Sequence, residues 1–182
     1  MGNYIDQRKK EVGLRMKELK NLWAPWRIEY ILGTKEKECF LCDRKYSNPA
    51  KQDDEYILLR GENTFIMLNA YPYNSGHLLI APYEHIGDIS QLDKKVLYEI
   101  SDMLVIAKNI LTKVMKPAGF NVGYNFGAAA GAGCEAHLHL HIVPRWIGDV
   151  NFMPVIGDTK VIPQALKDTA KVLSSAFEEQ NA

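Results

Sequence analysis

Residues 137–144 read HLHLHIVP, a short run in which histidines alternate with apolar side chains. Such alternation is typical of a β-strand, because successive side chains of a strand point to opposite faces of its sheet. In a strand spanning this run, the three imidazoles would share one face, and Leu138 and Leu140 would point into the core. The run therefore predicts a strand that carries a polar site on one face only.

The loop before this strand, residues 125–134, reads NFGAAAGAGC and has almost no side-chain bulk. Its backbone N–H groups, including those of Gly131, Ala132 and Gly133, can approach an anion closely. A Gly/Ala stretch alone is more typical of a flexible turn, but this one directly precedes three histidines. Because neutral imidazole can attack phosphorus, the two stretches together favour a nucleophile beside a phosphate site. A solvated histidine-rich surface and a zinc ion bound by three histidines are the alternatives.

The flanking sequence predicts further strands and helices. Short apolar runs bounded by turn residues indicate strands at 56–60, 64–69 and 77–82. Apolar residues recur at helical spacing over 90–116, which predicts a long helix, and a last strand before the glycine loop is expected at 121–126. A final helix is expected at about 163–179, with Pro163 in its first turn. This order lacks regular β-α-β alternation, so we expect an α+β fold with a largely antiparallel sheet.

Length and charge restrict the organisation of the chain and the classes of its partners. A chain of 182 residues suits one domain, and residues 1–30 predict a helical arm that docks on this domain or on a partner subunit. Lys plus Arg and Asp plus Glu both number 22, so no net charge favours a nucleic-acid polymer or a membrane surface. No long apolar run or apolar signal core occurs, and we expect a cytoplasmic protein.

The three cysteines point to metal or redox chemistry. Cys39 and Cys42 form a C-x-x-C pair, and Cys134 stands apart from them in the sequence. In a reducing compartment such a pair favours a metal site or a redox site over a structural disulfide. No β-α-β pattern surrounds the pair, which disfavours a thioredoxin-like role.

Two segments resemble the histidine triad (HIT) superfamily. Residues 137–145 are similar to its signature of three histidines alternating with apolar residues, and residues 69–77, NAYPYNSGH, are similar to a second segment. The resemblance implies a HIT-like fold, with a long helix and flanking terminal helices. It also implies that His139 is the nucleophile and that His141 and His77 bind the phosphate or move protons.

The same resemblance implies further ligands of the substrate. It assigns Asn69 to the ribose and Asn125 to the phosphates. Zinc-containing members take their metal ligands from an early cysteine pair, a histidine after the second segment and the first triad histidine. This chain has all four, which are Cys39, Cys42, His85 and His137. We therefore expect a structural zinc ion with no open coordination position, and no organic cofactor.

Four more segments, 22–27, 119–123, 148–152 and 161–164, resemble the bacterial diadenosine tetraphosphate phosphorylases of that superfamily. This implies nucleotidyl transfer through a covalent histidine intermediate, with inorganic phosphate as co-substrate, ATP and ADP as products, and a homodimer. Several relatives carry Gln or Ser where this chain has Gly133, and this departure bears on which acceptor the site uses. The alternatives are a HIT hydrolase of dinucleoside polyphosphates or nucleoside phosphoramidates, a non-catalytic nucleotide-binding module and a zinc-stabilised interaction protein.

Overall fold

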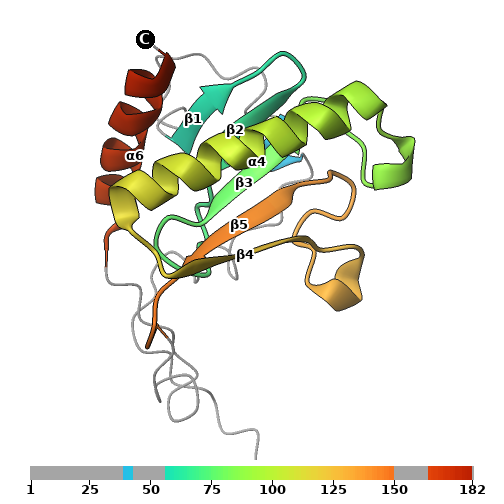
Figure 1. Ribbon diagram of the computed structural model, residues 1–182. Helices are drawn as coiled ribbons and strands as arrows, with labels where there is room; N and C mark the ends of the chain where they lie inside the picture. Colours follow the sequence, from blue (N-terminus) through green and yellow to red (C-terminus); the bar gives the residue numbers. More distant parts are fainter. Residues whose placement is uncertain (1–38, 43–55, 150–163, 182) are drawn as a thin grey trace, which may run out of the picture. The chain divides into compact units, whose positions relative to one another are not determined.

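The computed structural model describes residues 39–42, 56–149 and 164–181, and all of them belong to one contact unit of the chain (Figure 1). The arm expected at 1–30 lies outside the described residues, and the final helix, expected from about Pro163, begins at Leu166. A single domain over the whole chain therefore stays a prediction. None of the described helices is long and apolar enough to span a bilayer.

A five-stranded antiparallel sheet with the order β1-β2-β3-β5-β4 forms the centre of the fold (Figure 1). Its strands are β1 (Ile57–Arg60), β2 (Thr64–Leu68), β3 (Leu78–Pro82), β4 (Gly119–Tyr124) and β5 (Leu140–Arg145). The histidine run supplies β5, which lies inside the sheet between β3 and β4. The predicted α+β class with an antiparallel sheet is confirmed.

The strand predicted from His137 begins later, at Leu140. The backbone before it makes other hydrogen bonds: His137 N–H donates to the Cys134 carbonyl, and Leu138 N–H donates to the carbonyl of Ile86 at 2.6 Å. These bonds occupy donors that a longer strand would have given to its neighbour. The prediction of a strand over the whole run was therefore wrong at its first residues.

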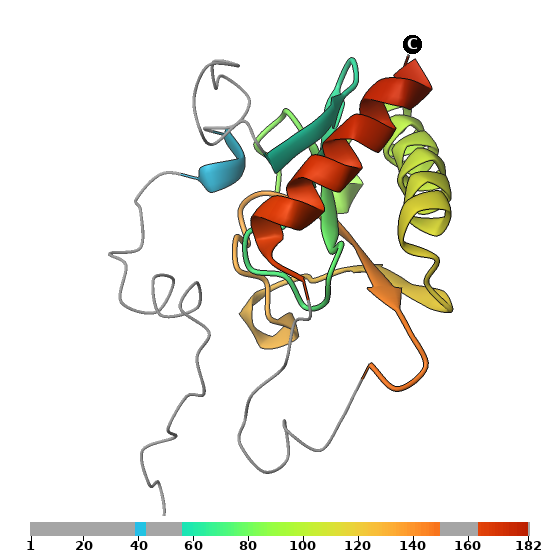
Figure 2. The same ribbon diagram turned by 90° about the vertical axis from the view of Figure 1, so that its left-hand side faces the viewer.

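Two helices cover one face of the sheet (Figure 2). They are α4 (Lys94–Met115) and α6 (Leu166–Asn181), and the short 3-10 helix η2 (Ile89–Gln91) precedes α4. The long helix was predicted to begin at about residue 90, but the Asp93 carboxylate caps α4 by accepting from Lys95 N–H, so the helix begins after it. Leu138 and Leu140 lie in the core beneath these helices, as predicted.

The opposite face of the sheet carries a smaller apolar cluster and the histidines. Phe65, Met67 and Leu79 pack there against Leu41, which belongs to the short helical segment 40–42. In Figure 2 this segment and α4 lie on opposite sides of the strands. His141 pairs across the sheet with Leu79, so its side chain lies on the same face as this cluster. The helices therefore bury one face and leave the other to the polar side chains.

Glu99 of α4 holds the turn between β1 and β2. Its carboxylate accepts hydrogen bonds from the N–H and side-chain amide of Asn63, at 3.0 and 2.7 Å, and from the N–H and hydroxyl of Thr64, at 3.1 and 2.9 Å. Burial acts to raise the pKa of Glu99, but these hydrogen bonds outweigh it and lower the pKa. The ionised carboxylate is therefore the form that the fold stabilises.

We expect Glu99→Gln to lower the free energy of unfolding by about 1–2 kcal/mol at neutral pH. The reason is that the N–H₂ group of the new side chain cannot accept hydrogen bonds from the donors of Asn63 and Thr64. Since the pKa is lowered on folding, this contribution is present above the pKa of the unfolded chain and disappears as the pH falls through the folded value. Urea unfolding of the variant and of the exposed-site control Glu62→Gln measures the effect. Equal unfolding midpoints for Glu99→Gln and the unaltered chain would contradict the prediction.

Candidate functional site

The five histidines of the chain divide into two clusters. The histidine cluster consists of His77, His139 and His141, with ring centroids 5.1 Å apart for His77 and His141 and 4.8 Å apart for His139 and His141. His85 and His137 form a separate pair, with centroids 5.2 Å apart. His137 therefore lies apart from His139 and His141, in the group of four residues that the resemblance assigns to the metal. His137 precedes β5, where strict strand alternation no longer holds.

A chain of hydrogen bonds fixes the ring nitrogens of His77 and His141. Tyr73 N–H donates to His77 Nδ1 at 3.0 Å, so a neutral His77 carries its proton on Nε2. His77 Nε2 lies 2.9 Å from His141 Nδ1 and donates to it. His141 then carries its own proton on Nε2, which lies 3.4 Å from Asn125 Nδ2; because both atoms would be donors, the Asn125 amide must turn its Oδ1 to this N–H to accept from it. This chain of hydrogen bonds from Tyr73 through His77 to His141, here called the relay, ends with the Nε2–H group of His141, which remains a donor.

His139 has the opposite arrangement of its ring nitrogens. Its Nδ1 lies 2.8 Å from the carbonyl oxygen of His137, which can only accept, so Nδ1 carries the proton. The Nε2 atom of neutral His139 therefore carries the lone pair. Two imidazoles in contact thus have complementary roles available, because His139 offers a nucleophilic nitrogen and His141 offers a hydrogen-bond donor.

Burial keeps both rings neutral near physiological pH. It lowers the pKa of His139, although the hydrogen bond to the His137 carbonyl opposes the shift. Burial, and then repulsion from His139, lowers the pKa of His141 to about 4. A neutral imidazole retains the lone pair that a nucleophile needs.

Tyr73 covers this relay, and sequence reasoning did not single it out. Its ring stacks on His141, with centroids 5.7 Å apart and planes 15° apart, and it tilts against His77 at 4.7 Å. Half of the Tyr73 side chain remains exposed, at 48%. An aromatic residue close before a candidate catalytic histidine is a weak sequence signal, because turns and cores use such residues equally often.

The structure brings the predicted asparagines to the histidine cluster. Asn69 Nδ2 lies 3.2 Å from His77 Nδ1, and Asn125 contacts His141 as described above. The predicted loop residues Gly131, Ala132 and Gly133 follow the 3-10 helix η3 (Ala128–Ala130), and Gly131 has a φ of 82°, which favours glycine. The role of these loop residues as phosphate donors stays a prediction.

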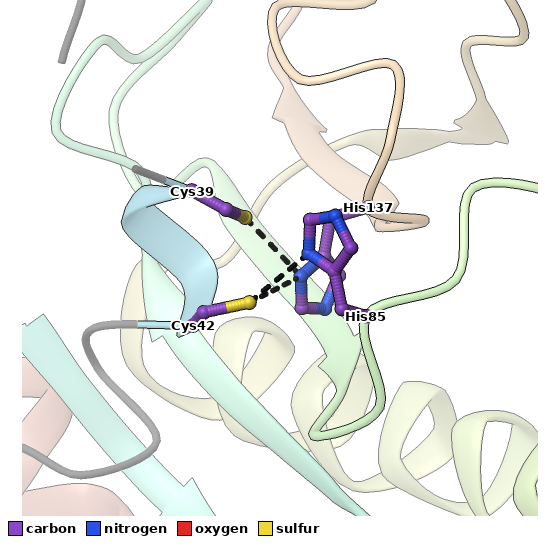
Figure 3. Close-up of side chains that lie close together, drawn as sticks. All are labelled: Cys39, Cys42, His85 and His137. Atoms are coloured by element: carbon purple, nitrogen blue, oxygen red, sulfur yellow. Dashed lines mark hydrogen bonds between the residues drawn. The ribbon is translucent and has the colours of Figure 1, made fainter. Parts of the chain in front are cut away.

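The second cluster, here called the thiol–imidazole cluster, consists of Cys39, Cys42, His85 and His137 (Figure 3). His137 Nδ1 lies 3.3 Å from Cys39 Sγ and 3.5 Å from Cys42 Sγ, and His85 Nδ1 lies 3.1 Å from Cys42 Sγ. The four side chains come from the segment at 40–42 and the residue before it, the loop after β3, and the approach to β5. Figure 3 shows them pointing toward one another.

This donor set and its spacing fit a tetrahedral metal ion. Zinc bonds of about 2.0–2.3 Å at tetrahedral angles separate neighbouring ligand atoms by about 3.3–3.8 Å. The three distances above are close to this range, and all four ligand atoms lie within 4.8 Å of one another. His137 Nε2 lies 2.9 Å from the Pro82 carbonyl and donates to it, which leaves Nδ1 to face the sulfur atoms. Cys134 lies near this cluster despite its distance in sequence, with its Sγ 3.5 Å from Cys39 Sγ.

Comparison with known proteins gives consistent matches. The family described as HIT domain matches residues 50–146. The AP-4-A phosphorylase of Mycobacterium tuberculosis (strain ATCC 25618 / H37Rv) is 36% identical over 169 residues, which cover 90% of this chain and 87% of that protein.

Two solved structures show a similar fold. A hypothetical histidine triad nucleotide-binding protein from Sulfolobus tokodaii has a TM-score of 0.60 at 22% identity, covering 79% of this chain and 94% of that one. A zinc-bound histidine triad family protein from Mycobacterium smegmatis has a TM-score of 0.52 at 23% identity, covering 69% and 85%.

Proposed function

This chain belongs to the HIT domain family, and on that premise we propose that it transfers a nucleotidyl group from a dinucleoside polyphosphate through a covalent intermediate on His139. The hydrogen bond from His139 Nδ1 to the His137 carbonyl carries the proposal, because it leaves the Nε2 lone pair for attack on phosphorus. The family match and the relative that bears the name AP-4-A phosphorylase support the substrate class.

In the first step His139 Nε2 attacks the α-phosphorus of diadenosine tetraphosphate. A nitrogen–phosphorus bond forms, the bond from that phosphorus to the bridging oxygen breaks, and its electron pair leaves on the oxygen of ATP. His139 Nδ1 keeps its proton and donates it to the His137 carbonyl oxygen, and this hydrogen bond stabilises the positive charge of the adenylylated ring. His141 Nε2–H donates to a phosphate oxygen as negative charge develops there, and this donor is already aligned by His77.

In the second step we propose inorganic phosphate as the acceptor. A phosphate oxygen attacks the adenylyl phosphorus, the nitrogen–phosphorus bond breaks, and its electron pair returns to His139 Nε2 with release of ADP. The loop around Ala132 and Gly133 has little side-chain bulk, which favours room for an additional anion, and the match to the relative with this activity in its name covers most of the chain. The alternative acceptor is water, which would make the protein a hydrolase.

If inorganic phosphate accepts the adenylyl group, the turnover rate should depend on the phosphate concentration. With diadenosine tetraphosphate as substrate, the rate should rise with phosphate concentration and saturate, and the products should be ATP and ADP. Product analysis by anion-exchange chromatography, with and without phosphate, measures this directly. Equal rates without phosphate, with AMP among the products, would place the protein among the hydrolases and leave the role of His139 in place.

We propose zinc as the ion of the thiol–imidazole cluster, held by Cys39, Cys42, His85 and His137. Two thiols and two imidazoles at tetrahedral spacing support this assignment. When bound, zinc supplies a cross-link between three chain segments and leaves no ligand position for substrate. His137 contributes its ring to this cluster and its carbonyl to His139, so the cross-link also steadies the proposed nucleophile.

We also propose a homodimer. The strand β4 lies at an edge of the sheet, where Val122 is exposed, and α4 exposes Tyr98 and Val105. Apolar side chains at an edge strand and on a helix surface favour association with a second copy. Sedimentation velocity should give twice the mass of one chain, and a monomer mass at micromolar concentration would contradict the proposal.

A further inference from the structure

A network of polar side chains is linked to the histidine cluster and takes no part in the chemistry proposed above. At its centre Asn74 is almost fully buried, with 3% of its surface exposed. Its side-chain amide donates to Asp149 Oδ2 at 2.8 Å and to the carbonyl of Pro144 at 3.0 Å. A buried side-chain amide whose two N–H groups both donate hydrogen bonds is a rigid connection between the segments that it joins.

Asp149 is held in turn by a two-point ion pair. Arg145 Nε donates to Asp149 Oδ2 at 2.6 Å, and Arg145 Nη2 donates to Oδ1 at 2.8 Å. The N–H of Trp146 also donates to this carboxylate, at 3.2 Å. The Nη1 atom of Arg145 donates to Asn121 Oδ1 at 2.6 Å. Such a planar, doubly bonded pair fixes orientation as well as distance.

The network joins the three segments that carry the polar residues of the site. Asn74 belongs to the loop before β3, Arg145 ends β5, and Asn121 lies in β4. The carbonyl of Asn74 accepts the N–H of His77 at 3.2 Å, and the residue before Asn74, Tyr73, supplies the N–H bound to His77 Nδ1. The position of Asn74 therefore sets two hydrogen bonds of His77.

The bonds to His77 Nδ1 from the Tyr73 N–H, at 3.0 Å, and from the Asn69 side-chain amide, at 3.2 Å, decide how His77 and His141 are protonated. If the loop moved enough to break the Tyr73 bond, and with it the bond from Tyr71 N–H to Asn69 Oδ1 at 2.9 Å, the Asn69 amide could turn its Oδ1 toward His77. His77 would then no longer have to accept on Nδ1, and its Nε2 could accept from His141 instead of donating to it. His141 would then carry its proton on Nδ1, and its Nε2 would face the substrate as a lone pair. A donor to the phosphate would become an acceptor, which repels the phosphate oxygens. The hydroxyl of Ser75, in the same loop, has no hydrogen-bond partner among the described residues, so it does not hold the loop in place of Asn74.

We propose that Asp149 is a positioning residue: through Asn74 it holds the Tyr73 N–H on His77 and thereby keeps His141 as an N–H donor toward substrate. The catalytic consequence rests on the function proposed above. The protonation pattern does not, because it can be measured without substrate.

The test compares Asp149→Asn with the unaltered protein in two measurements. Two-bond ¹H–¹⁵N spectra of histidine-labelled protein report which ring nitrogen carries the proton; we expect His77 and His141 protonated on Nε2 in the unaltered chain and a mixed pattern in the variant. Steady-state kinetics with diadenosine tetraphosphate and phosphate should show kcat lower by about tenfold to a hundredfold, with KM changed less than about threefold. The control Glu179→Gln removes an exposed ion pair with Lys113 and should change neither measurement.

Asn74→Ala provides a second variant, which removes the linking amide and leaves the ion pair of Arg145 and Asp149 in place. It should produce the same change in the histidine spectra, and it replaces Asp149→Asn if that variant does not fold. Unchanged proton positions on His77 and His141 in the folded variants, with kcat within about twofold, would overturn the proposal. A changed pattern, in a protein that does not turn over any dinucleotide, would support the positioning role and contradict the proposed function instead.

Discussion

Replacing His139 with alanine is expected to lower kcat by at least about a thousandfold while the protein stays folded. The reason is that no other described imidazole of the site presents a lone pair in the same way: His141 uses its Nδ1 to accept from His77 and carries a proton on Nε2. Binding should persist, because the remaining polar groups still contact the phosphates and ribose in the proposed site. Stopped-time product analysis and calorimetric titration with a non-hydrolysable dinucleotide separate the two effects.

His141→Ala is the matched variant for this experiment. It removes the neighbouring ring from the same strand region, and it should lower kcat while leaving covalent chemistry at His139 detectable, because the proposed nucleophile remains. Near-normal activity of folded His139→Ala, together with complete inactivity of His141→Ala, would contradict the assignment and make His141 the nucleophile.

Removal of the metal is expected to have the largest effect on stability. The purified protein should contain about one zinc ion per chain, and Cys39→Ser or His85→Ala should lower the free energy of unfolding by at least about 3 kcal/mol, or Tm by about 6–12 °C. Activity per folded molecule should fall less, because neither side chain belongs to the histidine cluster. Elemental analysis and thermal unfolding measure the two quantities.

Cys134→Ser is the control for the metal prediction. Cys134 Sγ lies 3.5 Å from Cys39 Sγ, yet Cys134 is not one of the four converging ligands. We therefore expect this variant to keep its zinc and most of its stability. Protein without metal, when purified under reducing conditions in the absence of chelators, would remove the zinc assignment and leave the pairing of the two cysteines without a function.

The local sequence pattern predicted the elements but not their limits. The alternation around Leu138 and Leu140 correctly placed both leucines in the core and identified β5. It could not show that the chain before Leu140 leaves the sheet. There the N–H of Leu138 donates to the carbonyl of Ile86, a residue distant in sequence. For the same reason, alternation alone did not show that His137 belongs to a different cluster from His139 and His141.

The side chains of the site could be predicted, but the bonds that give them their roles could not. Spacing and family resemblance named the five histidines, Asn69 and Asn125, together with the cysteine pair. The N–H of Tyr73 and the carbonyl of His137 decide which ring nitrogens carry protons, and they are backbone groups that any residue would supply. The link from Asp149 to Asn74 has no sequence signal either, since it joins a loop to the end of a strand far along the chain.

Detection of the covalent intermediate tests the central claim most directly. The enzyme is mixed with diadenosine tetraphosphate in buffer free of phosphate, quenched at alkaline pH where phosphoramidates survive, digested and analysed by mass spectrometry. We predict an adenylyl group on His139 that disappears, with formation of ADP, when phosphate is added before the quench. An adduct on His141, or turnover with no adduct on any histidine in rapid-quench samples, would contradict the role of His139 as nucleophile.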